Sequence, residues 1–329
     1  MLWELPIRKW KEPRKTSEGG YNMKCKLPNL FIVGAGKCGT TSLYYYLKQH
    51  SKIYLPDFKE PQYLSFKHFL NDIEKVVYPH KLNEFVLSEN EYFSLYRNDD
   101  IENKKYIGDA STAAFVFYEE FYKSVQQYYE KPQTNKIIII LRNPIEATIS
   151  HYLMYKRIFE IYNGAKYRSL EEAIKIEKKM FQNKYYAICH TFRYKFFDRI
   201  KFFKNHFDDV LILFHEDLKY NKDKVLTDIF TFLDIEKENI NTSENLNETI
   251  FPKNSFAKIF YKDSKFKILT KKILPSSLYI SLKKTRDNFL GTKQKNISEK
   301  EILILQNIFK EDIIKTSELL KKDLTKWIK

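Results

Sequence analysis

The sequence is poor in cysteine and in long apolar runs. Only three cysteines occur among 329 residues, and their odd number and wide spacing support neither a disulfide framework nor a Cys-x-x-Cys metal site. No stretch approaches the roughly 18 to 20 uninterrupted apolar residues of a membrane-spanning helix. Residues 1–15 mix charged with aromatic side chains and lack the apolar core of a signal peptide. We therefore expect a cytoplasmic protein in a reducing compartment, without a membrane span.

Negative charge is scarce relative to positive charge. The chain carries 57 Lys and Arg against 42 Asp and Glu, which gives a net charge of +15. Such an excess suits an anionic ligand, an acidic polymer or nucleic acid. Lysine, asparagine, isoleucine, tyrosine and phenylalanine are all abundant, however, as they are in a compositionally biased genome. Charge alone therefore does not identify the partner.

Short β-branched apolar runs alternate with longer helical patterns along the chain. Hydrophobic residues make up 43% of the sequence, which is enough for a large core. The alternation is typical of an α/β protein, in which helices cover both faces of a parallel sheet. The run KIIIIL fits a strand buried on both sides. The predicted strands are residues 30–33, 106–108, 136–141 and 210–214, and the predicted helices are residues 40–50, 113–130, 144–157, 169–205 and 221–233.

The domain organisation expected from these patterns is a single domain with two extensions. Residues 1–28 form an N-terminal extension, residues 29–255 the α/β domain, and residues 256–329 a Lys-rich helical C-terminal extension of the same domain. The sequence SEKE at 298–301 predicts a capping box that opens the last helix. Residues 57–105 follow no clear pattern, and we interpret them as an insertion over the site.

A glycine-rich loop follows the first predicted strand. Residues 34–42 read GAGKCGTTS, in which Gly34 and Gly39, with four residues between them, precede a hydroxyl pair that opens a helix. This is the geometry of a phosphate cradle, because glycines let consecutive N–H groups point at one anion. In a Walker loop the lysine follows the second glycine, whereas here Lys37 precedes Gly39 and Thr40 occupies the lysine's place. Taken alone, the loop is also compatible with an ordinary strand-to-helix turn.

A second anion site is predicted after the strand 136–141. Arg142 stands at the carboxyl end of that strand, where ligands bind in such sheets, and Asn143 and Pro144 suit the start of the next helix. Ser150 follows two helical turns later, and the guanidinium fork matches a phosphate. The structural alternative is that Arg142 caps a neighbouring helix. Two phosphate sites on neighbouring strands suggest a nucleotide with phosphates at both ends of its ribose.

With these motifs in view, the sequence resembles sulfotransferases that use 3′-phosphoadenosine 5′-phosphosulfate (PAPS), especially the carbohydrate (heparan sulfate-type) and bacterial branches. The resemblance covers roughly residues 29–235 and implies a P-loop-like three-layer fold with a central parallel β-sheet flanked by helices. It rests on the ordered segments FIVGAGKCGTTSLYYYL, FKEPQYLSF, IGDASTAAF, ILRNPIEATISHY and VLILFHEDL. A looser likeness, NETIFPKNSFAKIF, puts Lys253 where the bacterial branch has an arginine.

The resemblance implies roles for particular residues. It makes Glu60 the general base for the acceptor hydroxyl and Lys37 the group that stabilises the leaving 5′-phosphate, with Lys59 able to reach the sulfate. No metal is expected, because a neutral SO3 unit carries less charge than a phosphoryl group and the magnesium-binding half of a Walker site has no counterpart. The donor is expected to contact Lys37, Cys38, Gly39, Thr40, Thr41, Arg142, Ser150 and Lys253.

The acceptor side is less well defined by the sequence. Asp109 and Ser111 follow a predicted strand and are expected to face the acceptor, although the family more often has Glu at the first position. His68 is the alternative base, and the remaining histidines are interpreted as surface or packing residues. No residue among Phe192, Tyr194 and Phe196 is singled out as the side chain that stacks on adenine.

The function predicted from the sequence is in-line transfer of the PAPS sulfuryl group to a hydroxyl, with an amine as the second choice. The acceptor is expected to be a carbohydrate or other small molecule, with no nucleic acid as partner; the sequence does not indicate an oligomeric state. The competing hypotheses are a P-loop nucleotide kinase or hydrolase and a basic protein that binds nucleic acid or another anion. The kinase hypothesis requires a lysine after Gly39 and a strand-end aspartate for magnesium, and neither is found where expected.

Overall fold

The computed structural model describes residues 26–72, 85–97, 99–243, 250–254, 285–292 and 297–328, together with the single residues 257, 261 and 282. Most of the predicted N-terminal extension lies outside the described residues. So does much of the C-terminal extension between residues 255 and 296, as do residues 73–84 and 98 of the predicted insertion.

A parallel sheet forms the centre of the molecule. Its five strands pair in the order β2-β3-β1-β4-β5, and every pairing is parallel. All four predicted strands are confirmed. The additional edge strand, β2, has only two residues, too few to give a periodic signal in the sequence. The strands are β1 (Leu30–Gly34), β2 (Ile53–Tyr54), β3 (Tyr106–Asp109), β4 (Lys136–Leu141) and β5 (Asp209–Phe214).

The strand β4 shows why an unbroken apolar run is needed here. It lies between β1 and β5, and the side chains of residues 137–141 are fully buried. Since helices cover both faces of the sheet, side chains on both sides of β4 are removed from water. Burial of each such isoleucine contributes roughly 1.5 to 3 kcal/mol to folding.

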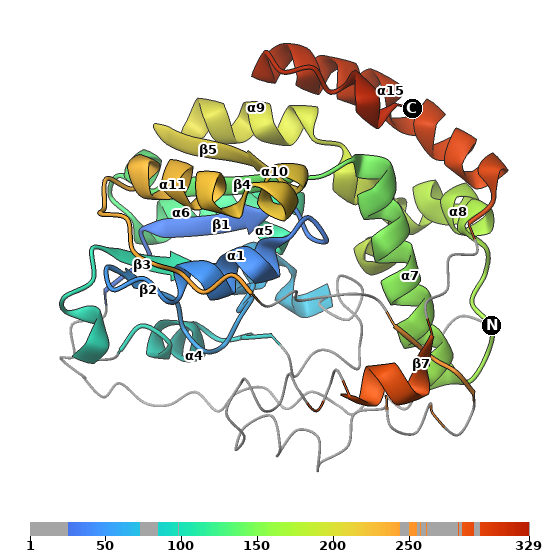
Figure 1. Cartoon of the computed structure of the whole chain (residues 1–329), viewed down its shortest axis with the longest axis horizontal. Helices are drawn as coiled ribbons and strands as arrows, with labels where there is room; N and C mark the ends of the chain where they lie inside the picture. The colour runs from blue at the N-terminus through green and yellow to red at the C-terminus, as the bar shows by residue number, and fades with distance from the viewer. Residues whose placement is uncertain are drawn as a thin grey trace.

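Helices cover the two faces of the sheet (Figure 1). On one face lie α1 and α11. His50, in the segment after α1, packs against Phe230 of α11, with ring centroids 4.8 Å apart. On the other face Phe121 of α6 packs between Phe31 of β1 and Phe203 of α9. The predicted α/β class and three-layer arrangement are therefore confirmed. The helices of the α/β domain are α1 (Thr40–Leu47), α2 (Tyr63–Phe66), α4 (Glu89–Ser94), α5 (Ala113–Val116), α6 (Tyr118–Tyr128), α7 (Pro144–Asn163), α8 (Leu170–Gln182), α9 (Phe197–His206), α10 (His215–Tyr220) and α11 (Lys222–Phe232).

The prediction of one helix over residues 169–205 was wrong. Helix α8 ends at Gln182 and α9 begins at Phe197, with the short 3-10 turns Tyr186–Ile188 and Phe192–Tyr194 between them. The buried carboxylate of Glu177 explains the break, since it accepts the backbone N–H groups of His190, Thr191 and Phe192. A side chain of α8 thus replaces the carbonyls that would satisfy these groups in a continuous helix.

Other helix boundaries also differ from the predictions. The helix expected over residues 113–130 is divided at Phe117 into α5 and α6. Helix α7 extends beyond residue 157 to Asn163, where Gly164 adopts a positive φ of 71° and ends it. The short helix α10, directly after β5, was not expected. Short 3-10 turns also occur at Lys67–Asp72, Asp99–Ile101 and Pro132–Thr134.

The described part of the C-terminal extension packs on the α/β domain. Helix α15 (Glu299–Leu320) begins with the predicted capping box, in which Ser298 and Glu301 bond reciprocally, and it contacts α7, α8 and α9. Beyond α15 lies the 3-10 turn Thr325–Trp327. The indole N–H of Trp327 donates to Glu216 of α10 over 3.1 Å, and the backbone carbonyl of Trp327 accepts from the Asn143 side chain over 3.4 Å. A two-residue strand pair, β6 (Phe251–Pro252) with β7 (Gly291–Thr292), completes the described elements.

Candidate active site

The glycine-rich loop connects β1 to α1 at the carboxyl edge of the sheet. Gly39 is the N-cap of α1 and has a φ of 105°, a conformation that residues with a Cβ rarely adopt. A Cβ at this position would also lie 3.0 Å from Nδ1 of His215 and 3.1 Å from Leu218. Both the backbone conformation and the close packing therefore require glycine at the start of α1.

Two side chains that directly follow other strands donate hydrogen bonds to carbonyl groups of the loop. Nδ1 of His215, the first residue after β5, donates to the Cys38 carbonyl over 3.1 Å. Nη1 of Arg142, the first residue after β4, donates to the Lys37 carbonyl over 3.4 Å. The C=O and N–H of one trans peptide unit point in opposite directions. The bond from His215 therefore directs the Gly39 N–H to the opposite side of the loop.

The first turn of α1 supplies further donors. Its first intrahelical bond runs from Leu43 N–H to the Gly39 carbonyl, so the N–H groups of residues 40–42 have no acceptor inside the helix. The first turn holds no acidic side chain, and the helix dipole places partial positive charge there. Together with Lys37 this end of α1 is suited to bind an anion, and anion binding here stays a prediction.

Arg142 links the loop to helix α7. Asn143 caps that helix by accepting the Ile145 N–H over 2.9 Å, as predicted, and Pro144 is its first residue. The Nε and Nη2 atoms of Arg142 donate to Glu146 over 3.0 and 2.7 Å, in a partly exposed ion pair. Ser150 is half-buried on α7, one turn beyond Glu146. The guanidinium therefore touches the loop and also faces the helix that carries Ser150.

The segment that carries Glu60 lies against residues that follow β3. Oε2 of Glu60 accepts from the Gln62 side-chain amide over 3.0 Å and from the Thr112 hydroxyl over 3.1 Å, and Oε1 contacts the ammonium of Lys59. Thr112 also adjoins the loop, since its Oγ1 lies 3.7 Å from where a Cβ on Gly36 would be. Thr112 therefore adjoins both the predicted base and the predicted phosphate cradle.

Asp109 and Ser111 form a buried layer behind Glu60. Ser111 donates to Oδ1 of Asp109, and Tyr92 of α4 donates to Oδ2 over 2.7 Å. Burial raises the pKa of Asp109 to about 6; the bonds from Ser111 and Tyr92 act in the opposite direction, and the charge of Glu60 adds to the increase. Asp109 is only 2% exposed. The sequence predicted that Asp109 and Ser111 face the acceptor. In this structure both are buried, and Asp109 supports the Glu60 segment through Ser111.

The other predicted residues lie as follows. The thiol of Cys38 is fully buried within the loop, and burial raises its pKa far above the ordinary value, so it stays protonated. The imidazole of His68 is exposed and lies 3.2 Å from the Ser124 hydroxyl on α6. The ammonium of Lys253 donates to the Phe289 carbonyl over 3.0 Å. The structure thus brings Lys37, Cys38 and Gly39 together with Arg142 and, through Thr112, with Glu60.

Three residues with clear contacts at the site received no role from the sequence. His215 was placed among the packing histidines, although its position directly after a predicted strand was a usable signal. Gln62 and Thr112 lie within recognised motifs, but no pattern in the sequence marks the contacts of Thr112 with Glu60 and of Gln62 with Ala113, which join residues about 50 positions apart. Among the candidate adenine partners, Tyr194 and Phe196 are buried in the core, and Phe192 is half-buried.

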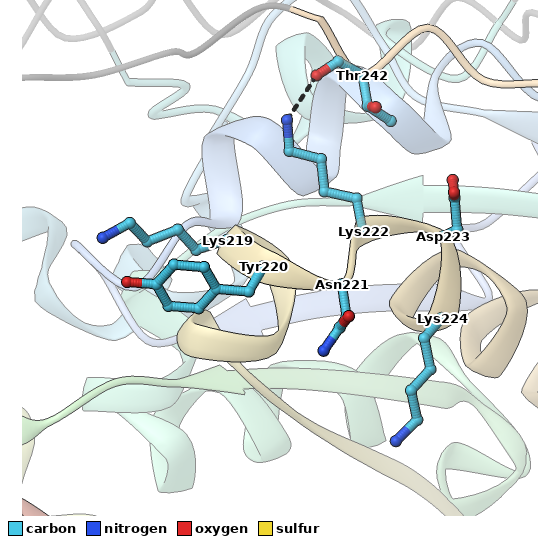
Figure 2. Close-up of a pocket in the computed structure, with 7 residues that line it drawn as sticks. All are labelled: Lys219, Tyr220, Asn221, Lys222, Asp223, Lys224 and Thr242. Carbon is cyan, nitrogen blue, oxygen red and sulfur yellow. Dashed lines mark hydrogen bonds between the residues drawn. The ribbon is translucent and has the colours of Figure 1, made fainter.

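A separate pocket of about 380 Å³ lies at the turn between α10 and α11. Its three lysine side chains extend in different directions, and the Lys222 ammonium donates to the Thr242 carbonyl over 2.8 Å (Figure 2). The positive charge is therefore not gathered around one point, and no predicted site residue lines this pocket. It is lined by Lys219, Tyr220, Asn221, Lys222, Asp223, Lys224 and Thr242.

The described residues contain neither a membrane-spanning helix nor a cluster of metal ligands. No helix in the described ranges is both long and apolar enough to cross a bilayer. No group of three or more His, Cys, Asp or Glu side chains within the same ranges could hold a metal ion. The absence of a metal from the reaction stays a prediction.

The chain is similar to proteins of one family. The family model described as the sulfotransferase domain matches residues 27–317. Membrane-associated sulfotransferase kil1 from Dictyostelium discoideum is 30% identical over 126 residues, which are 38% of this chain and 22% of kil1. Carbohydrate sulfotransferase 15 from Mus musculus is 29% identical over 159 residues, with 41% of this chain and 28% of the relative covered. The similarity thus spans less than a third of each of these curated relatives.

A solved structure supports the fold. The crystal structure of a sulfotransferase from Alicyclobacillus acidocaldarius matches with a TM-score of 0.62 and 21% identity, covering 92% of this chain and 100% of that one. At this identity the likeness concerns the fold, and it confirms the P-loop-like three-layer arrangement predicted from the sequence.

Proposed function

This chain belongs to the sulfotransferase domain family, and we propose that it transfers the sulfuryl group of PAPS to a hydroxyl of a carbohydrate or other small acceptor. Family membership makes it a sulfotransferase enzyme of the EC 2.8.2 type. The donor, the acceptor and the residue roles are our proposal. The observation that carries it is the contact between Arg142 and the Lys37 carbonyl. This contact places the two predicted phosphate sites side by side, as one nucleotide with two phosphate groups requires.

The residues present fit a PAPS molecule with phosphates at both ends of the ribose. The first turn of α1 and Lys37 would hold the 5′-phosphosulfate, because unpaired N–H groups and an ammonium favour an anion there. Arg142 and Ser150 would hold the 3′-phosphate. For this, the guanidinium would exchange its partly exposed ion pair with Glu146 for bonds to the phosphate, an exchange favoured because surface ion pairs are weak.

The proposed transfer step gives Glu60 and Lys37 one role each. The acceptor oxygen forms a bond to sulfur while the bond from sulfur to the bridging oxygen of the 5′-phosphate breaks, and the electron pair of that bond stays on the phosphate. Glu60 takes the proton of the acceptor hydroxyl. Lys37 stabilises the charge that develops on the leaving phosphate. The other product is 3′-phosphoadenosine 5′-phosphate (PAP).

The carbohydrate acceptor is supported by one of the relatives, which is named a carbohydrate sulfotransferase. A screen with labelled sulfate over sugars, phenols and lipids tests this part of the proposal. We expect transfer to a sugar hydroxyl, and exclusive transfer to phenols or lipids would contradict it. A cytoplasmic location and the absence of a nucleic-acid partner belong to the same proposal.

The donor is tested by nucleotide binding without metal. A ligand that binds the folded state raises the melting temperature, so we expect PAP to raise it more than ADP or ATP do. A preference for ADP or ATP would overturn the PAPS proposal and favour a P-loop kinase or hydrolase. Binding that ignores the 3′-phosphate and disappears as salt rises would favour a nonspecific anion-binding protein.

A further inference from the structure

The backbone around Glu60 adopts an unusual conformation. Glu60 and Gln62, on either side of Pro61, have φ values of 59° and 61°. Residues with a Cβ adopt this left-handed region rarely, and such residues persist only where the surrounding structure holds them. Since left-handed residues other than glycine cluster at functional sites, the contacts that hold this segment bear on its function.

Ser111 and Asp109 hold the backbone of the segment. The Gln62 N–H donates to the Ser111 hydroxyl over 2.9 Å, and that hydroxyl in turn donates to Asp109. The second carboxylate oxygen of Asp109 accepts from Tyr92. All three side chains are buried, so no competing water weakens these bonds. The left-handed turn is therefore fixed to the end of strand β3.

The side chain of Gln62 transmits this fixed position to Glu60. It is 4% exposed, and its Oε1 accepts the Ala113 N–H over 3.0 Å. Because that N–H requires an acceptor, the oxygen of the amide must face Ala113 and the NH2 group must face Glu60. The NH2 group donates to Oε2 of Glu60 over 3.0 Å. The amide thus has a single orientation, and it sets where the carboxylate lies.

We propose that Gln62 is a positioning residue that fixes the Glu60 carboxylate for proton transfer, with Ser111 and Asp109 as its anchor. This rests on the proposed function, in which Glu60 is the base. Oε2 of Glu60 accepts from both Gln62 and Thr112, which uses its two lone pairs. The acceptor's proton therefore goes to Oε1, from which the Lys59 ammonium turns toward the sulfuryl oxygens.

The test uses Gln62→Glu, which has the same shape and keeps an oxygen for the Ala113 N–H. The variant replaces the N–H donor to Glu60 by a second acid, so a bound proton is held more tightly on Glu60. We expect kcat with the acceptor found in the labelled-sulfate screen to fall about tenfold to a hundredfold. The apparent pKa on the acidic side of the pH profile of kcat/KM should rise by about one unit. The Kd of PAP should stay within twofold of the wild-type value.

Two further variants guard against a purely structural explanation. Thr112→Val removes the other donor to Oε2 at constant shape and should change kcat and that apparent pKa in the same direction, by less. Ser65→Ala is the matched control, because its hydroxyl is buried on the adjoining helix α2 with no partner among the described residues. It should leave kcat and the pH profile unchanged.

Lys59 from its own segment and Asp109 from β3 are two charged groups that act on Glu60. The shift caused by Gln62→Glu should therefore also be measured in an Asp109→Asn background, where we expect it to persist. A wild-type pH profile in Gln62→Glu, or a loss of PAP affinity as large as the loss of kcat, would overturn the inference. If Glu60→Gln is inactive while Gln62→Glu is normal, only this inference fails. If Glu60→Gln is fully active, the base in the proposed function fails too.

Discussion

The two halves of the candidate site are built in different ways. The nucleotide half consists of two continuous stretches, residues 34–42 and residues 142–150, each running from a strand into the helix that follows it. The base half combines Glu60 and Gln62 with Tyr92 from α4 and with Asp109, Ser111 and Thr112 from the end of β3. Local geometry therefore forms one half, and contacts between distant segments form the other.

This difference has a consequence for how each half responds to substitution. In the nucleotide half, we propose that backbone N–H groups and two cationic side chains act directly on an anion. In the base half, most of the residues act on the position of one carboxylate. We therefore expect substitutions in the nucleotide half to change donor affinity or leaving-group stabilisation, and substitutions in the base half to change turnover at constant donor affinity.

Glu60→Gln is the strongest test of this distinction. Removal of the general base should lower kcat by about 10²- to 10⁴-fold, while the Kd of PAP stays unchanged. Labelled-sulfate transfer gives the first quantity and calorimetry with PAP the second. Normal turnover would give the role of base to another residue, and a large loss of PAP affinity would show that the two halves are not separable.

Lys37→Ala tests the catalytic part of the nucleotide half. Loss of the ammonium should lower kcat by about 10²- to 10³-fold, because charge on the leaving phosphate is no longer stabilised. PAP affinity should fall much less. Lys52→Ala, at an exposed lysine beyond α1, is the control for a change in net charge. Equal losses in the two variants would contradict a specific role for Lys37.

Asp109→Asn tests the anchor of the base half through stability. Burial is the main reason why the pKa of Asp109 rises from 3.8 to about 6 in the folded chain. The folded state then binds the proton more tightly than the unfolded state, so this contribution to stability is complete below about pH 4 and is lost as the pH rises through about 6. Relative to the variant, the wild-type free energy of unfolding should fall by up to about 3 kcal/mol across this window. Urea denaturation of both proteins between pH 3.5 and 6.5 measures the difference, and parallel curves would contradict it.

Arg142→Ala should give the smallest effect. Loss of charge-assisted bonds to the 3′-phosphate should weaken PAP binding about tenfold to a hundredfold and leave ADP binding unchanged. Glu146→Gln is the matched control, because it removes the partner of Arg142 without removing the guanidinium, and it should not weaken PAP binding. Equal weakening of PAP and ADP in Arg142→Ala would mean that Arg142 acts only through the Lys37 carbonyl.

The sequence predicted the nucleotide half more completely than the base half. Gly39 and Asn143 indicate in the sequence where α1 and α7 begin. The left-handed conformation of the first residue and the side-chain cap of the second depend only on their immediate neighbours. The contacts of His215 and Arg142 with the loop could not be predicted in the same way. They depend on β4 pairing with β1 and β5 pairing with β4, which brings the first residue after each strand to the loop.

The break between α8 and α9 shows the same limit in the fold. Residues 169–205 have a continuous helical pattern, and nothing local marks residues 183–196 as irregular. The buried Glu177 carboxylate causes the break, because it accepts hydrogen bonds from three backbone N–H groups 13 to 15 positions later in the chain. Satisfaction of buried polar groups overrides helix propensity here.

By itself the sequence determined that this chain forms a parallel α/β sheet with a glycine-rich loop between its first strand and the helix that follows, since apolar runs and glycine positions act over a few residues. It also carried the resemblance to sulfotransferases, which the family match bears out. Only the tertiary structure decided which side chains surround Glu60. Those hydrogen bonds join residues about 50 positions apart in the chain, and they form only when folding brings the end of β3 against the segment that precedes α2.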